Sequence, residues 1–98
     1  MFAGTTFRIR GNVTEVDAKN KVTTVFVTHI EKGWPAVRFE NNPYTVRISK
    51  KGARVLKYNA AGQAVRMKIE SILVGKNVSI IGETRTDGTL DASTMILR

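Results

Sequence analysis

The chain contains no cysteine, one histidine and one tryptophan among its 98 residues. The absence of thiols excludes disulfides, thiolate zinc sites and cysteine nucleophiles. The single histidine, His29, has neither a second histidine nor a pair of acidic residues near it in the sequence, whereas metal sites of this kind need several ligands. We therefore expect His29 to be an ordinary strand residue, and we expect no bound metal and no other cofactor.

Catalytic motifs are missing as well. Ser49 and Lys50 are adjacent, but successive side chains of a strand face opposite ways, so this pair cannot form a Ser-Lys dyad. The eight acidic residues lie mostly near expected turns, and the sequence has no paired carboxylates, no Walker motif and no phosphate-cradling glycine loop. These absences predict a protein that is not an enzyme, with no catalytic residues and no small-molecule substrate.

Long apolar runs are absent too. Segments such as Val25-Phe26-Val27 fall far below the roughly 20 residues that span a bilayer. The first seven residues, MFAGTTF, have neither the charged start nor the apolar stretch of a signal peptide. We therefore expect no membrane association and a cytoplasmic or nucleoid-associated location. The length predicts a single domain over residues 1–98 with one core.

Alternation of apolar and polar residues is the main structural signal. Phe7, Ile9 and Val13 alternate with Arg8 and Arg10, which predicts a strand with a buried face and with both arginines pointing outward. Turn formers at 17–20 lead into a second strand over residues 21–30. Near the end of the chain, residues 76–85 and 89–97 predict two more strands, joined by the hairpin signal Asp87-Gly88.

The middle of the chain is less regular. Lys32-Gly33-Trp34-Pro35 interrupts the alternation, because proline removes a ladder donor and glycine tolerates a positive φ. This loop carries the only tryptophan. Extended segments follow at 36–40 and 44–50 around a turn or bulge at 41–43, and the pattern leaves open whether they form one bent strand or two.

An additional hairpin is predicted as a basic insertion at about residues 51–70. A helix over residues 63–74 is the alternative, because an apolar i, i+4 stripe also fits there. We expect an intermediate arrangement: a strand to about Glu70, then one helical turn over residues 71–74, which Gly75 ends as a left-handed cap. The chain as a whole therefore predicts a small closed barrel of strands, in which closure removes exposed edges.

The segment VGKNVSIIGETRTDGTLDAS, residues 74–93, resembles the end of an OB-fold domain. In such domains a helix leads into a Gly-Lys turn, a strand of the form Val-x-Ile-x-Gly, a tight turn and a last strand with Leu-x-Ala. The matching positions are Gly75, Val78, Ile80, Gly82, Leu90 and Ala92. The resemblance implies an all-β, five-stranded OB-fold barrel with one short helix before the fourth strand and with the hairpin as an addition.

Charge indicates the partner. Sixteen basic residues against eight acidic ones give a net charge of +8, and residues 41–69 contain seven basic residues and no acidic one. Basic side chains also block the aggregation of edge strands, but acidic residues would solubilise the chain equally well, so their absence favours an anionic partner. In size and charge the chain is similar to the single-stranded DNA-binding proteins of bacteria, phages and plasmids, which implies a setting in DNA replication or repair.

Aromatic residues refine this hypothesis. Trp34, Phe39, Tyr44 and Tyr58 lie in or beside the basic segments, whereas the strand neighbours of Phe7 and Phe26 predict a place in the core. A base stacked on an aromatic ring contributes about 1–3 kcal/mol whatever its identity. Trp34 is the preferred contact because loops carry binding groups, while a core position stays open for Phe39 and Tyr44.

The sequence therefore predicts a protein that binds single-stranded DNA largely regardless of sequence and that assembles into homo-oligomers. RNA binding is the nearest alternative, a protein-interaction or structural OB module with a basic surface is the second, and an enzyme completed by another chain is a distant third. The predicted nucleic-acid-binding residues are Arg8, Arg10, Trp34, Arg38, Phe39, Tyr44, Arg47, Lys50, Lys51, Arg54, Lys57 and Tyr58.

Overall fold

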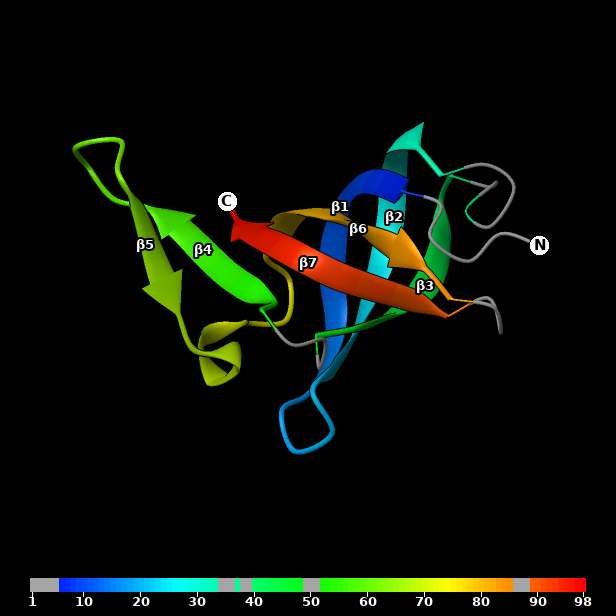
Figure 1. Cartoon of the computed structure of the whole chain (residues 1–98), viewed down its shortest axis with the longest axis horizontal. Helices are drawn as coiled ribbons and strands as arrows, with labels where there is room; N and C mark the ends of the chain where they lie inside the picture. Colours follow the sequence, from blue (N-terminus) through cyan, green and yellow to red (C-terminus); the bar gives the residue numbers. More distant parts are fainter. Residues whose placement is uncertain (1–5, 34–36, 38–39, 49–51, 86–88) are drawn as a thin grey trace.

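The computed structural model describes residues 6–33, 37, 40–48, 52–85 and 89–98, which form a seven-stranded sheet (Figure 1). The strands are β1 (Thr6–Asp17), β2 (Val22–Lys32), β3 (Asn42–Arg47), β4 (Arg54–Tyr58), β5 (Ala64–Met67), β6 (Asn77–Thr84) and β7 (Leu90–Leu97). A single 3-10 turn, η1 (Ile69–Ser71), lies before β6. In this described part of the chain, no helix has the length and apolar character needed to cross a membrane.

The sheet closes on itself. Its strand order is β3-β2-β1-β6-β7-β4-β5, and β3 also pairs with β7, so that β1, β2, β3, β6 and β7 form a ring. The β3–β7 and β4–β7 pairings are parallel and the others are antiparallel. The hairpin of β4 and β5 extends to one side of the ring (Figure 1). The predictions of an all-β chain and of an additional hairpin within residues 51–70 are confirmed.

Strict alternation builds the ring and its core. In β1, Phe7, Ile9 and Val13 are buried, while Arg8 is exposed and Arg10 half-buried, as the sequence predicts. Burying one such apolar side chain contributes roughly 1.5–3 kcal/mol. The buried core of the described residues comprises Phe7, Ile9, Val13, Val25, Val27, Val37, Val46, Ile48, Val55, Ile72, Val78, Ile80, Leu90, Ala92, Met95 and Leu97.

The expected helical turn over residues 71–74 is wrong, and the described residues before β6 contain no α-helix. β5 ends at Met67 rather than near Glu70, and within the described ranges η1 is the one helical element. Gly75 does have a positive φ of 90°, but its N–H donates to the carbonyl of Val13 at 2.7 Å. Because that donor bonds to β1, it is not available to a helical carbonyl, and residues 72–76 form a turn against β1 instead of a helix.

Two glycines permit close approach between strands. Gly82 lies at a shift in the register of β6 with β7, and a Cβ there would collide with the carbonyl oxygen of Asp91 and lie 2.9 Å from the Cα of Ala92. Gly11 in β1 meets the carbonyl of Phe26 in the same way. Backbone atoms cannot move aside as flexible side chains do, so these positions require glycine.

Replacing Gly82 with alanine should lower the free energy of unfolding by about 1–3 kcal/mol, because the added methyl group forces β6 and β7 apart. Urea denaturation measures the change. The control is Thr45→Ala on the exposed side of β3, for which we expect a change within about 0.5 kcal/mol. Equal stability of Gly82→Ala and the wild type would show that the two strands are not this close.

The turn between β1 and β2 is held by Asp17. Its carboxylate accepts hydrogen bonds from the side-chain Nδ2 of Asn20 at 2.7 Å and from the backbone N–H of Asn20 at 3.1 Å. These bonds, the side-chain one first, lower the pKa of Asp17 below its ordinary value of 3.8. Since the folded pKa is the lower one, this stabilisation is present above the ordinary value and is lost as the pH falls through the folded pKa.

Asn20→Ala should therefore raise the pKa of Asp17 part of the way back to its ordinary value, because the backbone bond remains while the side-chain bond is lost. An NMR titration of the Asp17 carboxyl carbon measures this pKa. An unchanged midpoint in the variant would contradict the assigned cause.

Candidate functional site

A row of outward-facing side chains crosses five strands. Residues that pair across neighbouring strands project from the same face of a sheet. Arg10 of β1 pairs with Ser79 of β6, and Ser79 pairs with Ile96 of β7. Ile96 in turn pairs with Leu56 of β4, which pairs with Arg66 of β5. The register thus joins the ring to the far strand of the hairpin on one surface.

A second row runs beside the first. Arg8 of β1 pairs with Ile81 of β6, Ile81 with Thr94 of β7, and Thr94 with Arg54 of β4. Each row therefore has an arginine from β1 near one end and an arginine from the hairpin at the other. We call the surface made by both rows the arginine face; its members are Arg8, Arg10, Arg54, Leu56, Arg66, Ser79, Ile81, Thr94 and Ile96.

One carboxylate lies between the two arginines of β1. Glu31 of β2 lies 3.4 Å from the Nε of Arg8 and 3.5 Å from the Nε of Arg10. The Arg8 side chain is 57% exposed and that of Glu31 is 44% exposed, so water screens these pairs and each contributes at most about 1 kcal/mol. Glu31 therefore neutralises part of the charge here without fixing the arginines firmly.

The predicted binding residues of the additional hairpin are divided between its two faces. Arg54 and Tyr58 alternate with Val55 and Lys57 along β4, so these two pairs point to opposite sides. Val55 is buried in the core. Arg54 and the 54% exposed Tyr58 therefore lie on the side of the arginine face, whereas Lys57 lies on the other side.

Two predicted residues of β3 lie elsewhere. Arg47 is exposed and pairs with Asp91 of β7, so its neighbour across the strands is a carboxylate. Tyr44 is half-buried and packs against the core. The predicted residues Trp34, Arg38, Phe39, Lys50 and Lys51 lie outside the described residues.

The prediction that Phe26 lies in the core is wrong. Phe26 is half-buried and pairs with Asn12 of β1 and Pro43 of β3, on the outer side of β2. Val25 and Val27 on either side of it are fully buried. In the apolar triplet Val25-Phe26-Val27, the period of two alone places Phe26 on the outer side, so the sequence did contain the signal for an outward-facing aromatic residue.

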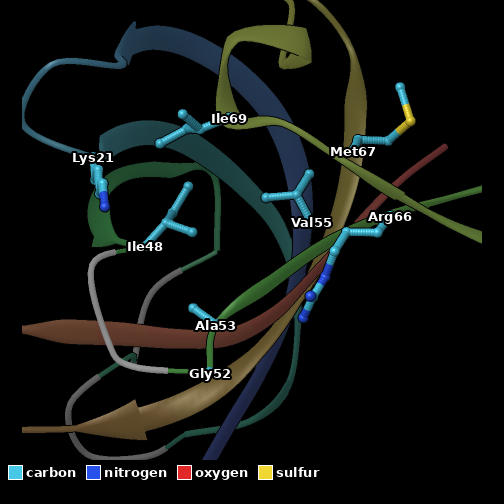
Figure 2. A pocket seen from close by; sticks show the side chains of 8 residues that line it. All are labelled: Lys21, Ile48, Gly52, Ala53, Val55, Arg66, Met67 and Ile69. Atoms are coloured by element: carbon cyan, nitrogen blue, oxygen red, sulfur yellow. The ribbon is translucent and has the colours of Figure 1, made fainter.

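A hollow of about 430 Å³ lies between the ring and the hairpin (Figure 2). Figure 2 shows Lys21 on one side of this hollow and Arg66 on the other, with Val55 between them. The lining residues are Lys21, Ile48, Gly52, Ala53, Val55, Arg66, Met67 and Ile69. The hollow thus combines apolar side chains with two cations, Lys21 and Arg66.

Metal chemistry has no donor set in the described ranges, where no group of three or more His, Cys, Asp and Glu residues could hold an ion. His29 is exposed, and its Nδ1 lies 3.1 Å from the hydroxyl of Thr28.

No protein family model, no curated protein and no solved structure matches this chain.

Alanine substitutions distinguish the fully buried Phe7 from the partly buried Phe26 by their effects on stability. Phe7→Ala should destabilise the fold by about 3–5 kcal/mol, because Phe7 is fully buried. Phe26→Ala should cost only about 1 kcal/mol, because Phe26 is only partly buried and lies outside the core. Urea unfolding of both variants gives the two values. A loss at Phe26 as large as the loss at Phe7 would place Phe26 in the core after all.

Proposed function

We propose that the protein binds single-stranded DNA, largely regardless of sequence, and that it catalyses no reaction. The observation that carries this proposal is the arginine face, where Arg8, Arg10, Arg54 and Arg66 lie on one surface with Glu31 as the adjoining carboxylate. Arginines fixed on a rigid sheet suit a regularly charged polymer, because each can neutralise one backbone phosphate. The overall charge of +8 attracts the same polymer over a longer range.

Aromatic rings on the outer side of the sheet support an unpaired strand over a duplex. Tyr58 lies at the opposite end of β4 from Arg54. Phe26 lies on β2, where it pairs with Asn12, and Asn12 lies two residues after Arg10 in β1. Bases of a single strand can stack on such rings, whereas the bases of a duplex are already stacked on one another. The positions of the rings at both sides of the cations fit a strand that crosses the arginine face.

We further propose an OB-fold of the single-stranded DNA-binding type, and the ring of five strands supports this proposal. Five strands close the ring, and OB-folds are five-stranded barrels that bind oligonucleotides. The motif that carries the resemblance also has a structural reason, since Gly82 pairs with Ala92 at a place where a Cβ would collide with the backbone of β7. Replication or repair, and assembly into homo-oligomers, stay predictions.

Fluorescence anisotropy with labelled oligo-dT at several salt concentrations tests this function. If the strand engages about four phosphates, the logarithm of affinity should fall with the logarithm of salt with a slope near −3. Arg54→Ala and Arg66→Ala should each weaken binding and reduce the slope by about 0.7.

The matched control is Lys19→Ala, which removes the same charge from the exposed turn between β1 and β2 and should leave the slope unchanged. A slope near zero would contradict the proposal, and so would equal effects of Lys19→Ala and Arg54→Ala. Competition with oligo-U of the same length separates the two nucleic acids: weaker competition than by oligo-dT supports DNA, and stronger competition assigns the function to RNA.

A further inference from the structure

A small pocket opens on the arginine face between β1, β6 and β7. Its volume is about 240 Å³, which is below the range of roughly 300–1,000 Å³ that is typical of sites for drug-sized ligands. A pocket of this size fits a compact group such as a phosphate with part of a sugar. The lining residues are Arg8, Arg10, Glu31, Ser79, Ile81, Ile96 and Arg98.

Three guanidinium groups line this pocket, although Glu31 meets two of them. The distances from Glu31 to Arg8 and Arg10, 3.4 and 3.5 Å, are longer than the 2.7–2.9 Å that is usual for a charge-assisted hydrogen bond. The Nε of Arg10 is shielded from water and has no hydrogen-bond partner among the described residues. Donors of these two arginines therefore remain for a stronger acceptor than Glu31.

The third arginine is held in place by the pocket wall. Arg98 donates from its Nε to the hydroxyl oxygen of Ser79 at 2.9 Å, and Ser79 is itself buried. A guanidinium group has five N–H donors, so this bond positions Arg98 and leaves its terminal N–H groups for a ligand. The hydroxyl proton of Ser79 is a further donor, because Ser79 uses its oxygen to accept from Arg98.

The charge of the pocket selects among phosphates. Three arginines and one glutamate sum to +2 (3 − 1). An internal phosphodiester carries one negative charge, whereas a phosphate monoester carries about −1.5 to −2 at pH 7 and offers three acceptor oxygens. The monoester thus matches both the charge and the number of donors more closely.

We propose that this pocket binds the terminal phosphate of a nucleic-acid strand, a phosphate monoester, with Ile81 and Ile96 packing against the sugar of the end nucleotide. The inference rests on the proposed function, and it adds that the protein distinguishes the end of a strand from its interior. Of the three arginines of the pocket, Arg8 and Arg10 are also members of the arginine face, whereas Arg98 is not.

Competition binding with three oligo-dT strands of one length tests the inference. One strand carries a 5′-phosphate, one a 3′-phosphate, and one has hydroxyl groups at both ends. We expect one of the two phosphorylated strands to bind about tenfold more tightly than the hydroxyl strand, because several charge-assisted hydrogen bonds are added. The preferred strand identifies which end enters the pocket.

Variants locate the effect. Arg98→Ala should abolish the preference for the phosphorylated strand, so that this variant binds the phosphorylated strand and the hydroxyl strand equally, because the arginine that only the pocket site uses is gone. The control is Arg85→Ala, which removes an arginine that lies 3.5 Å from Asp91 outside the pocket and should keep the preference.

The outcomes separate the two proposals. Equal binding of all three strands overturns the terminal-phosphate site and leaves the proposed function intact. A preference that survives in Arg98→Ala overturns this pocket as its location. If none of the three strands binds, the proposed function fails and the terminal-phosphate site fails with it.

Discussion

Parallel pairing along one edge of β7 holds the molecule together. The first residues of β7 pair with β3, at Leu90 and Val46, and its later residues pair with β4, beginning at Thr94 and Arg54. Buried backbone donors and acceptors need partners, and on this edge two separate strands supply them in succession. The first pairing closes the ring around the core and the second fixes the hairpin beside it. Both rows of the arginine face cross β7, so their alignment depends on this edge.

The same alignment gathers like charges that are far apart in the chain. Arg8 and Arg10 come from the first strand, while Arg54 and Arg66 come from the hairpin, and the register sets them on one side of the sheet. Like charges at the surface repel one another only modestly, because water and salt screen them, and Glu31 offsets part of the repulsion. A bound polyanion would replace this repulsion with attraction, which is the physical reason for the proposed partner.

Local patterns predicted much of the fold but not its register. Alternation is sufficient to predict that Phe7 points inward and Arg8 outward. The same period of two also places Phe26 on the outer side of β2. It could not separate Arg47 from Arg54: they are close in sequence, yet one pairs with Asp91 and the other with Thr94, because β3 and β4 meet β7 at different places. The misplaced helical turn has the same origin, since a bond from Gly75 to β1 is a long-range contact.

The arginine side chains themselves give the most direct test of the account. In an NMR titration of the labelled protein with unlabelled oligo-dT, the Nε–Hε resonances of Arg8, Arg10, Arg54 and Arg66 should shift together along one binding curve. The resonance of Arg85, beside Asp91, should stay nearly still and serves as the internal reference. Shifts confined to Arg85 and Arg47, or spread evenly over all arginines, would contradict the claim that one face of the sheet receives the strand.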